Sequence, residues 1–122
     1  MKSREELIDL VQSLAPESVY SARELATFID APLGTVNGWL SDRRAFPPKE
    51  IGARRSRVYD NSTLKRLAVY LAATRQGLGL NGNDVKLLIT QIQIDDAWGY
   101  YCEGLSNLAS FLLEKRNHII GE

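Results

Sequence analysis

The fold is decided by residues 20–80, which read YSARELATFIDAPLGTVNGWLSDRRAFPPKEIGARRSRVYDNSTLKRLAVYLAATRQGLGL. The first half of this stretch has two short segments with apolar residues at helical spacing, separated by a turn. The second half has a Pro-Pro pair, a run dense in arginine and a tyrosine. This order predicts a small pair of helices followed by a basic hairpin, in a mostly helical fold.

The pair of helices is predicted from capping and periodicity. Ser21 and Glu24 form a capping box that opens the first helix, which should end near Asp30. Its buried face is expected to hold Ala22, Leu25, Ala26, Phe28 and Ile29. After a turn, residues 33–40 form a second short helix, whose inward side is expected to hold Val36, Trp39 and Leu40. These offsets predict a helix-turn-helix, in which the small Ala26 lets the second helix cross closely.

A two-stranded wing is predicted after the helix pair. Pro47 and Pro48 favour an extended, non-helical connection. Residues 51–59 carry β-branched and aromatic residues around Gly52 and three arginines, a composition typical of short strands in a hairpin. Together with the helix pair, the hairpin predicts a winged helix-turn-helix.

Further helices flank this unit on both sides. They are predicted at residues 3–14, 63–76 and 84–93, with a final helix that follows Asp95 and Asp96 and runs to about His118. The helix ends are predicted from a capping box of Ser3 with Glu6, an N-cap at Asn61 or Ser62, a C-terminal glycine at Gly77 and an N-cap at Asn83. We therefore divide the chain into an accessory helix at 1–17, a winged domain at 18–94 and a C-terminal helix at 95–122.

The final helix has an apolar seam at spacings of three and four. The seam consists of Trp98, Tyr101, Leu105, Leu108 and Leu112. It is either part of the internal core or a dimer contact, and the helix at 3–14 could cover part of it. The seam offers more apolar surface than the small preceding helices can cover, so we predict that it joins two copies of the chain as a homodimer.

Charge is unevenly distributed along the 122 residues. The net charge is zero, yet residues 41–67 hold eight Lys/Arg and three Asp/Glu, a local charge of +5, and the rest of the chain sums to −5. A concentrated basic segment is the footprint expected of a polyanion-binding surface, because phosphate neutralisation is local. The alternative is a solvated charged loop.

Length and composition indicate which other classes of protein are not expected, namely membrane proteins, secreted proteins and enzymes. The chain is long enough for one domain with an appendage, and no apolar run approaches the length of a membrane span, so we expect a protein without membrane association. The start does not resemble a signal peptide, and a single cysteine allows no internal disulfide, so we expect a cytoplasmic location. With one histidine, one cysteine and no phosphate-binding glycine loop, we expect neither an enzyme nor a bound cofactor.

Cys102 invites a metal-site interpretation. One thiol cannot complete a tetrahedral site, and His118 lies about 24 Å further along a continuous helix. We therefore expect no metal and interpret Cys102 as a small buried apolar residue.

Several motifs resemble the DNA-binding domain of the MerR family. They begin with residues 20–26, YSARELA, and continue through Thr35-Val36, Trp39, Pro47-Pro48, Arg57-Val58-Tyr59 and Leu64 to Leu67. They end with residues 75–80, RQGLGL, and the resemblance covers about residues 20–92. The family resemblance implies a winged helix-turn-helix that binds promoter DNA as a dimer, and RNA polymerase or another DNA-bound protein as a further partner.

The resemblance also implies roles for particular residues. The expected DNA-binding set is Thr35, Asn37, Gly38, Arg43, Arg44, Arg54, Arg55, Arg57, Tyr59, Lys65 and Arg66. Thr35 and Asn37 would face the major groove, the wing would hold the backbone, and Lys65 or Arg66 would touch phosphate. The chain departs from the family at Asn37, Gly38 and Leu40, where the family usually has arginine, an aromatic residue and an acid, so base readout is expected to differ.

Elementary geometry leaves some of these roles open. Thr35 and Asn37 project roughly 200° apart on a helix and cannot share the centre of one face. Asn37 either reads adenine or is merely exposed. Trp39 shares the inward side with Val36 and is expected in the core. Tyr59 either packs under the wing or gives its hydroxyl to a phosphate.

The sequence thus predicts a dimeric, sequence-specific duplex-DNA-binding regulator of transcription. One alternative is an architectural DNA-binding factor, resembling an excisionase or a terminase small subunit. The other is a protein-interaction module that has lost DNA binding.

Overall fold

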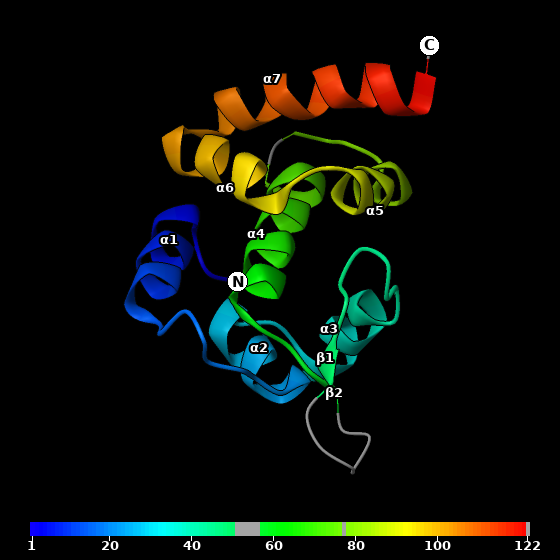
Figure 1. The fold of residues 1–122 in the computed structure, drawn as a ribbon. Coiled ribbons are helices and arrows are strands. Elements are labelled where there is room, and N and C mark those ends of the chain that lie inside the picture. Colours follow the sequence, from blue (N-terminus) through cyan, green and yellow to red (C-terminus); the bar gives the residue numbers. More distant parts are fainter. Residues whose placement is uncertain (51–56, 77, 122) are drawn as a thin grey trace. The chain divides into compact units, whose positions relative to one another are not determined.

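A computed structural model describes residues 1–50, 57–76 and 78–121 of the chain (Figure 1). The described residues are mostly helical, with one short strand pair among them, as the sequence predicts. They divide into two compact units, residues 1–64 and 65–122, and the division falls inside helix α4. The sequence-based boundaries lie instead at 17/18 and 94/95.

The first unit contains three helices before its strands: α1 (Arg4–Ser13), α2 (Ala22–Ile29) and α3 (Leu33–Leu40). Both predicted capping boxes are confirmed. The Ser21 hydroxyl accepts from the Glu24 amide at 3.1 Å, and the Ser21 amide donates to the Glu24 carboxylate at 2.9 Å. Ser3 and Glu6 repeat the arrangement at the start of α1. Each box satisfies two amides that a helix N-terminus would otherwise leave without a partner.

The turn between α2 and α3 has a left-handed residue at its start. Asp30 has φ 60° and ψ 57°, and its amide donates to the Ala26 and Thr27 carbonyls. Ala26 is 5% exposed, as expected for a small residue where two helices meet. The inward side of α3 is confirmed, since Val36, Trp39 and Leu40 are all buried. Trp39 is therefore a core residue.

A short antiparallel strand pair follows α3. Strands β1 (Lys49–Glu50) and β2 (Arg57–Val58) pair in the register Lys49 with Val58 and Glu50 with Arg57. The predicted wing spans more residues than this pair, and its central part, residues 51–56, lies outside the described residues. Beyond β2, Tyr59 exchanges two backbone hydrogen bonds with Tyr20, at 2.7 and 2.8 Å. This bridge ties the residue before the α2 capping box to the strand pair.

Helix α4 (Asn61–Arg75) begins two residues earlier than predicted, and its cap is different. The Asp60 carboxylate accepts from the amides of Ser62 and Thr63, at 3.0 and 3.4 Å, so Asp60 acts as the cap rather than Asn61 or Ser62. Asn61 is otherwise engaged, because its side-chain oxygen accepts a 2.7 Å hydrogen bond from the Tyr20 hydroxyl. The predicted glycine end at Gly77 lies outside the described residues.

The second unit continues with α5 (Gly82–Gln91), α6 (Ile94–Glu103), α7 (Leu105–Arg116) and a π-helical turn, η1 (Asn117–Gly121). The cap of α5 is Asn81, not Asn83, because the Asn81 side chain accepts from the amides of Asn83 and Asp84. The prediction of a single final helix is also wrong. This segment forms two helices separated at Gly104. The first begins at Ile94, so Asp95 and Asp96 lie in its first turn.

The seam residues mostly lie inside the second unit. Tyr101, Leu108 and Leu112 are fully buried within this one chain. Trp98 and Leu105 are half-buried, and Trp98 stacks on Tyr101 with ring centroids 4.9 Å apart. Three of the five seam residues are thus enclosed within one chain, and the expectation that the seam joins two copies as a homodimer stays a prediction. No helix in the described part of the chain is both long and apolar enough to cross a membrane.

Candidate nucleic-acid interface

The outward side of α3 is a stripe of small, uncharged residues. Gly34, Asn37, Gly38 and Ser41 recur at the i, i+3, i+4, i+7 spacing that places residues on one helix face, and all are exposed. The opposite face holds the three buried residues that anchor the helix. The Ser41 hydroxyl donates to the Gly38 carbonyl at 2.6 Å, which satisfies one of the last carbonyls of the helix. We call this stripe of four residues the α3 outer face.

Of the two residues predicted to contact bases, Thr35 and Asn37, only Asn37 lies on the α3 outer face. Asn37 lies on the stripe with its side chain exposed, whereas Thr35 is half-buried at the edge of the helix. The structure therefore does not bring Thr35 and Asn37 together on one contact face. The predicted DNA-binding set includes Gly38 but neither Gly34 nor Ser41, although their spacing from Asn37 and Gly38 places them on the same helix face.

The two glycines of α3 are not required by packing against the described residues. A Cβ built at Gly34 or at Gly38 meets no atom of the described residues within 4 Å. Each glycine costs the helix about 1 kcal/mol relative to alanine. Their effect is to leave the α3 backbone bare on its exposed side, where another surface can approach closely.

Two arginines follow α3 on an ordered turn. Arg43 and Arg44 are exposed. The Asp42 carboxylate accepts from the amides of Arg44 and Ala45, at 3.1 and 3.2 Å, and so holds this turn. Phe46 is fully buried and fixes the end of the turn in the core. The basic side chains thus start from a backbone held at both ends.

The strand pair contributes one described arginine. Arg57 on β2 is exposed, while Arg54 and Arg55 lie outside the described residues. Tyr59 is only 2% exposed, which favours a packed side chain over a phosphate contact.

Lys65 and Arg66 are engaged within the second unit. The Lys65 ammonium is 2.9 Å from the Asp95 carboxylate, and Arg66 Nη1 donates to the Ile89 carbonyl at 2.9 Å. These contacts join the start of α4 to α6 and α5. Each printed contact uses one of the several N–H donors of its cation, so the expectation that Lys65 or Arg66 touches phosphate stays a prediction.

The structure offers no support for a metal centre in the described part of the chain. No group of three His, Cys, Asp or Glu side chains there could hold an ion. Cys102 is half-buried rather than buried as expected.

Comparison with known proteins does not assign this chain to a family, since no protein-family model, no curated protein and no solved structure matches it.

Proposed function

We propose that this chain binds duplex DNA in a sequence-specific way, with α3 as the recognition helix of a winged helix-turn-helix. The observation that carries the proposal is the α3 outer face, which is exposed, uncharged and small, on a helix whose other side is anchored in a core. The major groove of B-DNA is wide enough to admit an α-helix. A face without bulky side chains lets the helix lie deep in that groove.

Base discrimination in this proposal comes from Asn37. An asparagine amide offers one donor and one acceptor, which match the N6 amino group and N7 of adenine in a bidentate pair. The bare backbone at Gly34 and Gly38 brings the Asn37 side chain, which is short, within reach of the base edges. A pair of this kind discriminates by about 1–3 kcal/mol against another base.

Affinity comes from the arginines that follow. Arg43 and Arg44 on the turn after α3, and Arg57 on β2, are exposed cations in the same unit as α3. Each contact with a phosphate releases condensed counterions, so binding weakens as salt is added. Resemblance to the MerR family favours a promoter-binding regulator that acts as a homodimer in the cytoplasm, with RNA polymerase or another DNA-bound protein as its neighbour on the promoter.

A fluorescence-anisotropy titration with duplexes selected from a random pool tests the proposal. We expect Arg57→Ala to weaken binding to all duplexes and to reduce the slope of log K against log salt by about 0.9, the value for one lost phosphate contact. Asn37→Ala should instead reduce the preference for selected over random duplexes by roughly tenfold or more.

Arg116→Ala is the matched control, because it removes one positive charge in the second unit, at the end of α7. It should leave both quantities nearly unchanged. Absence of binding by the parent protein, or equal effects of Arg57→Ala and Arg116→Ala, would overturn the proposal. The arrangement of the selected sites separates a regulator from an architectural factor, since palindromes indicate the first and arrays of direct repeats the second.

A further inference from the structure

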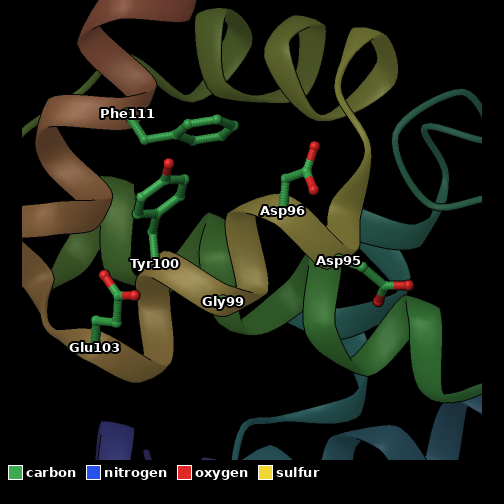
Figure 2. Close-up of a pocket in the computed structure, with 6 residues that line it drawn as sticks. All are labelled: Asp95, Asp96, Gly99, Tyr100, Glu103 and Phe111. Carbon is green, nitrogen blue, oxygen red and sulfur yellow. The ribbon is translucent and has the colours of Figure 1, made fainter.

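A groove runs between α6 and α7 in the second unit (Figure 2). One part, of about 470 Å³, is lined by Asp95, Asp96, Gly99, Tyr100, Glu103 and Phe111. An adjoining part, of about 200 Å³, shares Tyr100, Glu103 and Phe111 and extends to Glu114 on α7. We call the two parts together the α6–α7 groove.

The floor of the groove is a stacked aromatic pair. Phe111 reaches from α7 over Tyr100 of α6, with ring centroids 4.8 Å apart and planes inclined by 26° (Figure 2). Tyr100 is 41% exposed, so the aromatic pair is accessible from solvent. The Lys115 ammonium lies 5.6 Å from the Phe111 centroid, so the pair already has one cation at a ring face.

The walls of the groove are acidic. Asp96, Tyr100 and Glu103 follow one face of α6, and Figure 2 shows the Asp96 carboxylate on the same side of the helix as Tyr100. Asp95 pairs with Lys65, but among the described residues neither Asp96 nor Glu103 forms an ion pair. The groove therefore joins an exposed aromatic surface to carboxylates along its length.

Helix stability accounts for only some of these acids. Asp95 and Asp96 lie in the first turn of α6, where the helix dipole favours negative charge, and Asp95 also pairs with Lys65. Glu103 is the last residue of α6, where the same dipole disfavours an acid. Its Oε1 accepts from Nδ2 of the Asn107 side chain at 3.2 Å, and its position beside Tyr100 suits an external cation.

We propose that the α6–α7 groove docks an arginine-bearing segment of a protein partner. A planar guanidinium can stack on an aromatic ring and donate a pair of hydrogen bonds to a carboxylate at the same time, which an ammonium cannot do. Acids at both ends of an elongated, open groove match an extended chain with more than one cation. The proposal uses residues of the second unit alone, so it does not depend on DNA binding by α3.

Calorimetric titration of the full chain with the peptide acetyl-Gly-Arg-Gly-Gly-Arg-Gly-amide tests this directly. We expect saturable binding that is lost, by roughly tenfold or more, when both arginines are replaced by citrulline, which keeps the shape but removes the charge. Replacement by lysine should weaken binding several-fold, because stacking and the paired hydrogen bonds disappear.

Variants of the protein localise the effect. Tyr100→Leu and the double change Asp96→Asn, Glu103→Gln should each weaken peptide binding by about tenfold. The double change Asp9→Asn, Glu17→Gln alters the net charge by the same amount at exposed positions of the first unit, and it should leave binding unchanged. Circular dichroism of each variant should match the parent, since the altered groove residues are exposed.

Three results would overturn the proposal. The first is no heat of binding at millimolar peptide, and the second is equal weakening by both double changes, which would indicate general charge attraction. The third is a parent protein whose self-association, measured by sedimentation, is abolished by Tyr100→Leu, since the groove would then be occupied by a second copy of the chain.

Discussion

At the scale of single residues, Gly38→Ala should change the stability of the protein and its DNA binding in opposite directions. Its position on α3 is exposed, and a Cβ there meets no described atom within 4 Å. We therefore expect Gly38→Ala to raise the free energy of unfolding by about 1 kcal/mol, through higher helix propensity. The same methyl group stands on the α3 outer face and should weaken DNA binding if the backbone approaches the groove closely.

The measurements are urea unfolding and anisotropy titration on the same variant. Ser41→Ala is the control, because it alters the same face without adding volume. A Gly38→Ala protein that is more stable and binds DNA as tightly as the parent would contradict close approach by the α3 backbone.

Glu6 gives the α1 capping box a pH dependence. Hydrogen bonds from the amide and the hydroxyl of Ser3 lower the pKa of the Glu6 carboxyl below its ordinary value of 4.5. Because the folded pKa is the lower one, the box contributes its stabilisation above pH 4.5 and loses it as the pH falls through the folded pKa. Acid should therefore loosen the start of α1.

The amide resonances of Ser3 and Glu6, followed by NMR between pH 6 and pH 2, report this transition. In Glu6→Gln the side chain still accepts from the Ser3 amide but does not titrate in this range. The shift of the Ser3 amide should then become nearly independent of pH. A Ser3 profile that is the same in both proteins would show that the box does not govern it.

The cap of α4 shows how a single hydrogen bond changes a local prediction. Asp60, Asn61 and Ser62 are adjacent, and each has a side chain that can cap a helix. Asn61 accepts from the hydroxyl of Tyr20, forty-one positions earlier in the chain, and Asp60 caps instead. Burial of Tyr20 raises the pKa of its hydroxyl above the ordinary value of 10.0, so the donor remains protonated further into the alkaline range.

At the scale of elements, the break between α6 and α7 depends on the backbone of Gly104. Its φ of 159° and ψ of 158° lie in a region that is essentially confined to glycine. A Cβ there meets no described atom within 4 Å, so the cost of a side chain is conformational rather than steric. We expect Gly104→Ala to lower the free energy of unfolding by about 1–3 kcal/mol.

Gly99→Ala is the matched control for this change. Gly99 is an exposed residue inside α6, and a Cβ there also meets no described atom within 4 Å. The alanine should raise the free energy of unfolding by up to about 1 kcal/mol. Chemical denaturation of both variants checks the opposite signs, and a stabilising Gly104→Ala would show that α6 and α7 can join into one helix.

The seam shows why helical periodicity overestimates exposed contact surface. Spacings of three and four continue across residue 104, so the pattern predicts one long helix with one apolar stripe. A glycine in a conformation that other residues rarely adopt ends the helix there, and α6 and α7 pack on each other instead. The stripe is then divided between two helices, and three of its five residues are fully buried within the chain.

At the scale of the whole molecule, neighbouring leucines on α7 distinguish core from surface. Leu112 is fully buried and Leu113 is 42% exposed. We expect Leu112→Ala to lower the free energy of unfolding by about 2–5 kcal/mol, because it leaves a cavity. Leu113→Ala should cost less than about 1 kcal/mol, and sedimentation of Leu112→Ala should show the same association state as the parent.

Urea unfolding and sedimentation velocity at matched concentrations measure both effects. The expectation of an exposed dimer seam makes the opposite prediction, that Leu112→Ala dissociates a dimer with little loss of stability. That outcome would show that Leu112 contacts a second copy of the chain.

The sequence by itself determined the mostly helical class, the residues of α2 and α3, both capping boxes and the buried side of α3. These features depend on interactions within about four residues, which periodicity and cap chemistry record directly. Only the tertiary structure decided the burial of Tyr59, the partners of Lys65 and Arg66, and the enclosure of the seam. The physical reason is distance along the chain: Lys65 meets Asp95 across thirty positions and Arg66 meets Ile89 across twenty-three, and no local pattern encodes such pairs.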